Sequence, residues 1–275
     1  MVFSPELSLA EVEDALGGEF TQLQPLNAGG QGVVFRALSA TGESVALKVY
    51  FADQLEERNA REVLALRDIA GPTLVRLLDA GKVNLRGLEC AYMATAFVEG
   101  AVLADVILHG PCRPEDVVAW GQDIASAVDA LWSRRIVHRD IKPKNIVVAT
   151  DGHATLIDLG VARHLTLEAI TTTGTTWGTV GYMSPEQARA VRQLSCKSDV
   201  FSLGLVMQEC LAGYHPTSRN QLVLANGGFP TLRVAPSTPP SLATAIDRMV
   251  CLAPFDRPTP QEVVAILAGM VDSNA

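Results

Sequence analysis

The sequence predicts an α+β chain with two lobes, a small β-rich lobe followed by a larger helical lobe. Three stretches predict this class. Residues 20–50 hold strand-like runs broken by a turn signal, residues 117–131 carry apolar side chains at spacings of three and four, and residues 200–211 are apolar almost all round. The first pattern is typical of an antiparallel meander, and the others are typical of an amphipathic and a buried helix.

Length and composition fit one domain of this kind. A chain of 275 residues with 48% hydrophobic residues can fill one bilobed core, but not several large domains. The net charge is −8 and the Lys and Arg residues are scattered, which argues against binding to nucleic acid or to an acidic membrane. The five cysteines are odd in number and lack CxxC or metal-ligand spacing, so we expect reduced thiols in a cytoplasmic protein.

The N-terminus argues against export. Residues 1–20 carry five acidic side chains and no basic start ahead of an apolar run, unlike a signal peptide. No uninterrupted apolar run reaches the roughly 18 residues of a membrane span. We therefore expect a soluble chain without a membrane span.

A leader helix and a meander come first. Ser8 and Glu11 form a capping box that opens a short helix within residues 1–18. The N-lobe, about residues 19–98, then begins with the runs Val33–Leu38 and Ser44–Val49, which an Ala-Thr-Gly turn signal joins.

Two further elements complete the N-lobe, and a long helix opens the C-lobe. Residues 53–69 have the pattern of an amphipathic helix, and residues 89–98 that of a strand. The C-lobe, about residues 99–271, begins with a helix near Pro114. The core face of this helix consists of Val117, Trp120, Ile124, Val128 and Leu131.

The rest of the C-lobe combines a hairpin with helices. Ile146–Val148 and residues 154–157 flank an Asp-Gly turn, a favoured hairpin pair. The buried helix 200–211 follows, and a capping box of Thr259 and Glu262 opens the last helix. Because ligands often bind between lobes, we expect the hairpin and the loop before it near the functional site.

Two motifs of the N-lobe are weak when taken alone. The hairpin Leu26–Val34 could bring backbone close to a phosphate, because Gly29, Gly30 and Gly32 have no side chain, but an ordinary flexible hairpin would read the same way. Lys48 ends the next strand, where a lone lysine is usually a solvated edge residue. Their interpretation depends on the C-lobe.

The decisive segment is the polar loop His138-Arg139-Asp140-Ile141-Lys142-Pro143-Lys144-Asn145, followed after the hairpin by Asp158-Leu159-Gly160. With the glycine-rich hairpin and Lys48 ahead of it, this set resembles the catalytic domain of bacterial, eukaryotic-like serine/threonine protein kinases. The resemblance covers residues 20 to about 270. It implies the bilobed protein kinase-like fold and transfer of the γ-phosphate of ATP to Ser and Thr hydroxyls of proteins.

The resemblance also implies which residues are catalytic. Asp140 would accept the proton of the substrate hydroxyl, and Lys142 would steady the transferred phosphate. Lys48 would contact the α- and β-phosphates while Glu62, on the amphipathic helix, holds it as an ion pair. Thr179 would touch the catalytic aspartate and lysine.

The binding sites for Mg²⁺ and ATP follow from the same resemblance. Asn145 and Asp158 would be the Mg²⁺ ligands, since hard oxygen donors suit that ion. Thr95 would be the gatekeeper at the back of the adenine pocket, just before the hinge between the lobes. The residues expected to bind the nucleotide are Leu26, Gly29, Gly32, Val34, Ala46, Lys48, Thr95, Ala96 and Val98.

Two structural contacts are implied around the end of the activation segment, residues 178–186. Glu186 would pair with Arg257. Asp199 would brace the backbone of the loop at 138–140, although a charge that favours a helix N-terminus is an alternative reading of Asp199.

The threonine-rich part of that segment implies regulation. Phosphorylation of Thr171, Thr172, Thr173, Thr175 or Thr176 by the kinase itself would pin the segment, with Arg139 as the receptor for the phosphate. Autophosphorylation between two molecules would need a transient dimer. The alternative is that these threonines form a polar linker.

Four positions depart from the usual kinase pattern. Asn27 stands where the first loop glycine is common, and Asn tolerates positive φ better than most residues. Leu159 replaces a phenylalanine, Ser184 replaces an alanine, and Val102 occupies a position where an acid often binds the ribose.

Two other functions stay open on the sequence. A pseudokinase would have this fold without transfer activity, but such proteins usually lose Lys48, Asp140 or Asp158. Small-molecule kinases of the aminoglycoside or choline type share the fold and the spacing from Asp140 to Asn145. They generally lack a segment like 178–186.

Overall fold

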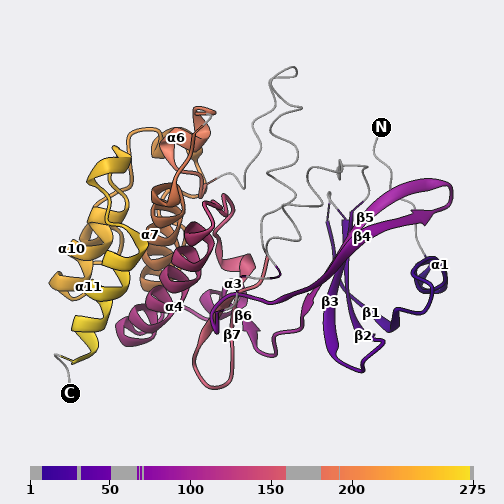
Figure 1. Ribbon diagram of the computed structural model, residues 1–275. Coiled ribbons are helices and arrows are strands. Elements are labelled where there is room, and N and C mark those ends of the chain that lie inside the picture. The colour runs from indigo at the N-terminus through magenta and orange to yellow at the C-terminus, as the bar shows by residue number, and fades with distance from the viewer. Residues whose placement is uncertain are drawn as a thin grey trace. The chain divides into compact units, whose positions relative to one another are not determined.

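The computed structural model describes residues 8–29, 32–50, 67, 69, 71–158, 181–191 and 193–272. The chain separates into two compact units. The described residues up to 69 and Val75–Phe97 build the first unit, and Gly71–Leu74 with the described residues from Val98 onward build the second. Both elements of the predicted α+β class are present (Figure 1), a sheet in the first unit and mainly helices in the second.

An antiparallel sheet of five strands forms the first unit. Its strands are β1 Phe20–Gly29, β2 Gly32–Ser39, β3 Ser44–Tyr50, β4 Leu77–Leu85 and β5 Leu88–Ala96. They lie in the order β1-β2-β3-β5-β4, so the predicted meander is confirmed. The sequence pattern did not indicate β4, which forms the edge next to β5.

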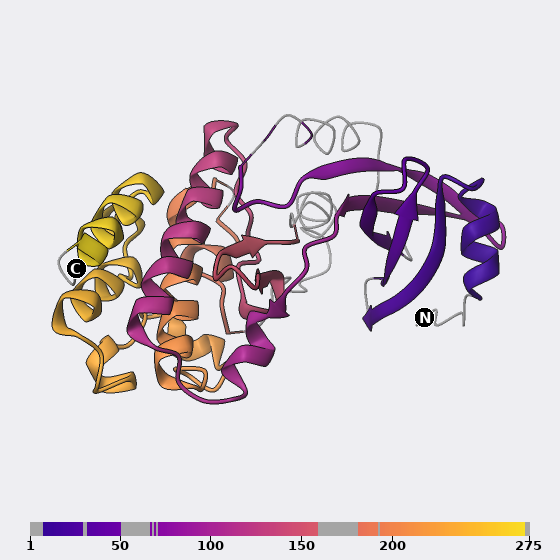
Figure 2. The ribbon, with the colours of Figure 1, turned by 90° about the horizontal axis from the view of Figure 1, so that it is seen from below.

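The N-terminal helix packs against this sheet. Helix α1, Leu9–Ala15, starts at the predicted capping box of Ser8 and Glu11. Val12 and Leu16 are buried in one hydrophobic cluster with the sheet, because α1 lies against β1 and β4 (Figure 2). The predicted leader helix therefore contributes to the core of the first unit.

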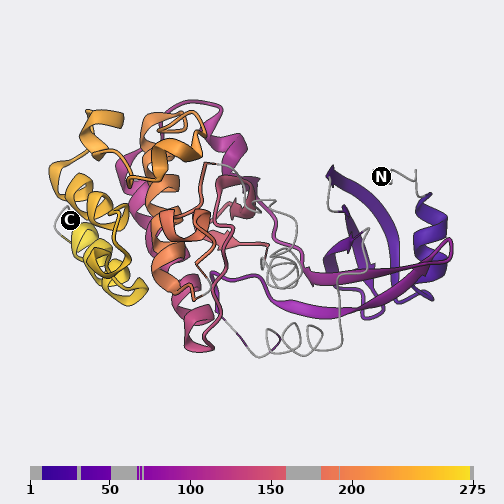
Figure 3. The same cartoon turned by 90° about the horizontal axis from the view of Figure 1, so that it is seen from above.

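Helices dominate the second unit (Figure 3). The long ones are α4 Pro114–Ser133, α7 Cys196–Ala212, α10 Pro240–Met249 and α11 Pro260–Asp272. The short ones are α3 Leu103–Ile107, α6 Pro185–Ala188, α8 Gln221–Leu224 and α9 Thr231–Val234, with 3-10 turns η2 Pro143–Asn145 and η4 Pro254–Asp256. A small sheet of β6 Ala101–Val102, β7 Ile146–Val148 and β8 Ala154–Leu156 completes the unit.

The predicted helices of the second unit are confirmed. Helix α4 buries the expected face and packs against α7 and α11, while α7 is buried along nearly its whole length. Thr259 and Glu262 form the expected capping box at the start of α11. The Trp120 indole N–H of α4 donates to the Gly152 carbonyl at 3.1 Å, which fixes the turn of the hairpin β7–β8. The helix predicted over 53–69 lies outside the described residues.

Candidate active site

One face of the first unit's sheet gathers the predicted nucleotide-binding side chains. Along β3, Val45, Leu47 and Val49 point into the core, so Ala46 and Lys48 lie on the opposite face. Val34 is directly opposite Lys48, and Thr95 is directly opposite Ala46. Directly opposed residues share a face. The four residues, which the resemblance implies at the nucleotide, therefore share one face of the sheet.

The predicted hinge begins at Ala96, the last residue of β5. The side chain of Thr95 is 5% exposed, and its hydroxyl lies 3.5 Å from the Ala46 carbonyl oxygen. The Ala96 N–H donates to the Arg76 carbonyl at 2.9 Å. Among the described residues, the first unit ends at Phe97, so Val98 belongs to the second unit, where it is half-buried.

The glycine-rich hairpin has a structural requirement at one of its glycines. A Cβ on Gly32 would lie 2.1 Å from the Val49 carbonyl oxygen, so β2 can pair with β3 only if residue 32 has no side chain. Gly29 pairs with Gly32 at the end of β1 and β2, and Leu26 is half exposed. The glycine at 32 is thus explained by strand packing, whatever the loop binds.

The polar loop before β7 brings three predicted residues together. The Lys142 ammonium donates to Asp140 Oδ2 at 2.9 Å. The Asn145 amide nitrogen donates to the Asp140 carbonyl at 2.8 Å and to Asp140 Oδ2 at 3.2 Å. All three side chains are buried or nearly so, with Asp140 7% exposed. The loop therefore holds a carboxylate between a cation and an amide.

Asp158 joins this cluster through the backbone. The Ile157 N–H donates to the Asn145 carbonyl at 2.9 Å, so the residue after it lies beside Asn145. The His138 imidazole Nε2 hydrogen-bonds to the Asp158 carbonyl. The Asn145 amide nitrogen faces Asp140, so its side-chain oxygen is not used in those bonds. This oxygen and the Asp158 carboxylate are hard donors of the kind that fit Mg²⁺.

Asp199 braces the polar loop from α7, as the resemblance implied. Its two carboxylate oxygens accept the His138 and Arg139 N–H groups, each at 2.8 Å. Burial raises the pKa of this carboxyl, and the charges and N–H groups of His138 and Arg139 oppose that rise. The carboxylate thereby fixes the backbone that enters Asp140.

We expect Asp199→Asn to impair this loop, because one amide N–H would then face a backbone N–H. Leaving a buried donor unpaired costs about 1–3 kcal/mol. For the phosphoryl transfer that the resemblance implies, turnover should fall while the KM for ATP stays unchanged. Steady-state kinetics would be compared with Asp123→Asn, whose carboxylate accepts the Ala154 N–H away from the loop. Equal loss of turnover in both variants would contradict the bracing role.

Residues 181–183 are held by a frame of polar side chains. The Gly181 N–H donates to Gln221 Oε1 at 3.0 Å, and Gln221 Nε2 donates to the Met183 carbonyl at 2.8 Å. His215 Nε2 donates to the Gly181 carbonyl at 2.9 Å, and the Ser202 hydroxyl donates to the Tyr182 carbonyl at 2.7 Å. The backbone here is thus fixed on both sides.

His215 is held as a neutral imidazole. Its Nδ1 accepts the Arg219 N–H at 2.9 Å and the Thr217 N–H at 3.2 Å, which leaves the proton on Nε2. Burial lowers the pKa of His215 to about 4, the Gly181 carbonyl opposes this fall, and the charge of Arg219 adds to it. The ring also packs edge-on against Tyr182.

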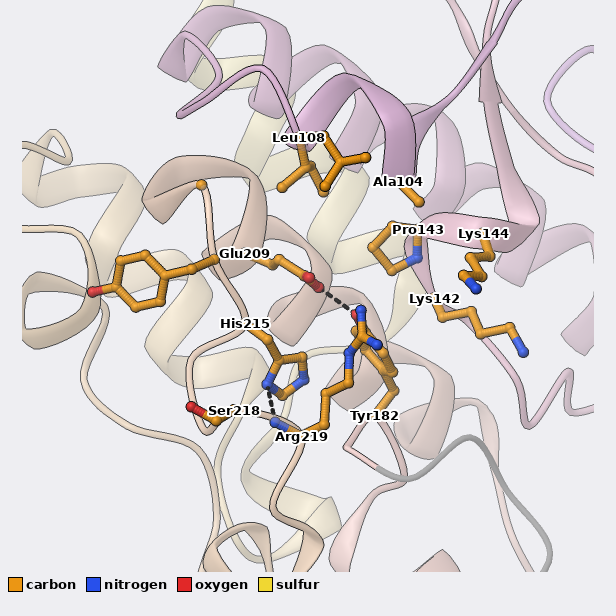
Figure 4. A pocket seen from close by; sticks show the side chains of 13 residues that line it. Ala104, Leu108, Lys142, Pro143, Lys144, Tyr182, Glu209, His215, Ser218 and Arg219 are labelled. Carbon is orange, nitrogen blue, oxygen red and sulfur yellow. Dashed lines mark hydrogen bonds between the residues drawn. The ribbon is translucent and has the colours of Figure 1, made fainter.

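A pocket of about 500 Å³ opens beside this frame. Figure 4 shows Tyr182, Glu209, His215 and Arg219 converging at one wall. The Tyr182 hydroxyl donates to Glu209 at 2.5 Å, and burial raises the pKa of Glu209 although the Tyr182 bond and Arg219 oppose it. Lys142 lines the same pocket, which places the wall next to the polar loop.

The sequence patterns missed His215, Gln221 and Glu209. His215 and Gln221 carry no local period, and their partners lie more than 30 residues earlier in the chain. Glu209 had a usable signal, since it is the one acid in the mostly apolar stretch 200–211. Glu62, Thr179 and the threonines of 171–176 lie outside the described residues.

The pairing of Glu186 and Arg257 is confirmed. Arg257 is buried and binds both carboxylate oxygens, at 2.7 and 2.9 Å. Ser184 accepts the Gln187 N–H through its hydroxyl, which caps α6. The Gln187 side chain donates to the Arg139 carbonyl at 2.7 Å, so α6 is tied to the polar loop.

Comparison with known proteins agrees with this arrangement. The family model described as protein kinase domain matches residues 20–266. The chain belongs to the protein kinase family. It is 33% identical over 260 residues to the serine/threonine-protein kinase AfsK of Streptomyces coelicolor. The aligned stretch covers 91% of this chain and 32% of that protein.

Two other relatives are similar in extent. The probable serine/threonine-protein kinase PkwA of Thermomonospora curvata is 33% identical over 91% of this chain and 34% of its own length. The serine/threonine-protein kinase PknH of Mycobacterium bovis is 32% identical over 84% of this chain and 40% of its own length. The chain therefore spans about a third of these relatives. Among the described residues, no helix has the length and apolar character needed to cross a membrane.

Proposed function

We propose that this chain is a protein serine/threonine kinase that transfers the γ-phosphate of ATP to Ser and Thr hydroxyls of proteins. The observation that carries the proposal is the cluster of Asp140, Lys142 and Asn145, held in one loop by direct hydrogen bonds. A protein kinase needs a carboxylate at the attacking hydroxyl and a cation near the transferred phosphate. Asp140 and Lys142 supply these two groups.

ATP and Mg²⁺ are the proposed cofactors. Asn145 and Asp158 would hold the ion, and bound Mg²⁺ would neutralise charge on the phosphates. On the first unit, Lys48 would bind phosphate oxygens, while Val34, Ala46 and Thr95 on the same face would contact the adenine. Leu26, Gly29, Gly32, Ala96 and Val98 complete the proposed nucleotide site, and Glu62 and Thr179 the catalytic set.

The proposal is tested by phosphoryl transfer from labelled ATP. The purified chain would be incubated with Mg²⁺, ATP and a lysate of proteins whose own kinases have been inactivated by heat. Phosphoserine and phosphothreonine on proteins, identified by mass spectrometry, are the expected products. ATP binding without transfer would instead identify a pseudokinase, and transfer only to small molecules a small-molecule kinase.

We also propose that the kinase phosphorylates its own segment 171–176. The sequence places five threonines there, and a phosphate on any of them offers an arginine such as Arg139 a doubly charged partner. Enzyme expressed with a phosphatase should show a lag after ATP is added, and prior phosphorylation should remove the lag. Phosphosite mapping identifies the threonine. Full activity in a variant with all five threonines changed to alanine would contradict the proposal.

A further inference from the structure

Two cysteines from different elements of the second unit lie side by side. Cys112 is in the loop before α4, and Cys210 is near the end of α7. The Cys112 N–H donates to the Cys210 carbonyl at 2.8 Å. Backbones joined by such a bond have Cα atoms about 5–6 Å apart, a separation that a disulfide can span.

The loop is also pressed against the end of α7. Gly213, which caps the helix, has a left-handed φ of 77°. A Cβ on Gly213 would lie 2.9 Å from the Pro111 nitrogen and 3.2 Å from the Gly110 carbonyl carbon. The loop and the helix end are therefore in close contact, with the Pro111 ring Cδ 3.0 Å from the same Cβ position, and the two cysteines are held in register.

The two thiols differ in exposure and acidity. Cys112 is half-buried, whereas Cys210 is 2% exposed. The neighbouring Cys210 thiol lowers the pKa of Cys112, although burial and Asp116 oppose it. The neighbouring Cys112 thiol, together with burial, raises the pKa of Cys210. Cys112 is thus the thiol that solvent reaches and that ionises first, with a protonated thiol beside it.

We propose that Cys112 and Cys210 form a peroxide-sensitive dithiol that closes to a disulfide. The Cys112 thiolate attacks hydrogen peroxide, which breaks the O–O bond and gives a sulfenic acid and hydroxide. The Cys210 sulfur then displaces the sulfenic hydroxyl, which leaves as water with the Cys210 proton. The two sulfurs lose two electrons in total, and the peroxide gains them.

The cross-link would fix one wall of the pocket relative to the other. Ile107 and Leu108 come just before the loop that contains Cys112, and Glu209 and Gly213 flank Cys210. All four line the pocket. Oxidation should therefore tie the end of α3 to the end of α7. This inference does not depend on phosphoryl transfer, because it concerns thiol chemistry alone.

The test is peptide mapping of the chain after mild hydrogen peroxide, without reducing agent. The expected product is a Cys112–Cys210 cross-linked peptide whose mass is lower by two hydrogen atoms, within a monomer. Titratable thiols should fall from five to three, and the Tm should rise by about 5 °C or more. Dithiothreitol should reverse both changes.

Two variants make the outcome specific. Cys112→Ser should abolish the cross-link and the rise in Tm. Cys251→Ser is the matched control, since Cys251 is also half-buried but its thiol donates to the Asp247 carbonyl. This variant should form the same cross-link and show the same rise in Tm as the unchanged chain. The proposal is overturned by sulfinic acid on Cys112 without a cross-link, by a bond to another cysteine, or by five thiols after peroxide treatment.

Discussion

Asp140→Asn is expected to lower the turnover of phosphoryl transfer by about 10²–10⁴-fold, the range that a positioned general base contributes. Asparagine keeps the size of the side chain but cannot accept the substrate proton. It also removes the negative charge 2.9 Å from the Lys142 ammonium. The KM for ATP should change little, because Asp140 is not among the residues proposed to bind nucleotide.

The measurement is single-turnover transfer to a protein substrate, with the Tm recorded for each variant. Asp151→Asn is the matched control, since Asp151 is exposed at the hairpin turn and accepts the His153 N–H there. It should transfer phosphate like the unchanged chain. Asp158→Ala should also lose transfer, but with weaker Mg²⁺-dependent nucleotide binding. Unchanged transfer in a folded Asp140→Asn variant would refute the assignment of Asp140.

Patterns within a short stretch of sequence predicted the parts of the fold that local physics controls. The apolar spacing of α4 predicted its buried face, and capping boxes predicted where α1 and α11 begin. Strand β4 was missed because it contains Asp79, Gly81 and Asn84, residues with little preference for strands. Residues 77–85 form a strand because they pair with β5, and no pattern within these residues predicts that pairing.

The candidate site also has a part that local sequence reveals and a part that only the folded chain reveals. The loop from 138 to 145 could be recognised because its residues are contiguous, and the structure then places Asp140, Lys142 and Asn145 in contact. The frame around Gly181 could not be recognised, since His215 and Gln221 approach it only when the chain folds. Contacts between residues that are far apart in the sequence can be identified only from the structure.

Breaking the pair of Arg257 and Glu186 is expected to destabilise the chain by about 3–5 kcal/mol, because it leaves one buried charge without its partner. The Arg257 side chain donates five hydrogen bonds, two of them to Glu186 and the others to the carbonyls of Lys197, Cys251 and Leu252. The Ser198 hydroxyl also donates to Glu186 at 2.6 Å. Arg257→Met removes all five donors at once.

The expected fall in Tm for Arg257→Met is about 6–20 °C. Arg257→Lys keeps the charge but loses the planar group, so its Tm should lie between those of Arg257→Met and the unchanged chain. The control is Arg113→Ala, which breaks an exposed ion pair with Asp116 and should cost less than about 1 kcal/mol. Equal Tm values for Arg257→Met and Arg113→Ala would contradict the role of the buried pair.

The pair should also make stability depend on pH. Burial pushes the pKa of Glu186 upward, but the bonds from Arg257 and Ser198 outweigh burial and lower it. A carboxyl with a lowered pKa stabilises the folded chain above the pKa of the unfolded chain, about 4.3, and this contribution is lost as the pH falls through the folded pKa. Denaturant unfolding of Glu186→Gln should accordingly show less loss of stability below pH 4.3 than the unchanged chain. A parallel loss in both would mean that other carboxyls control acid unfolding.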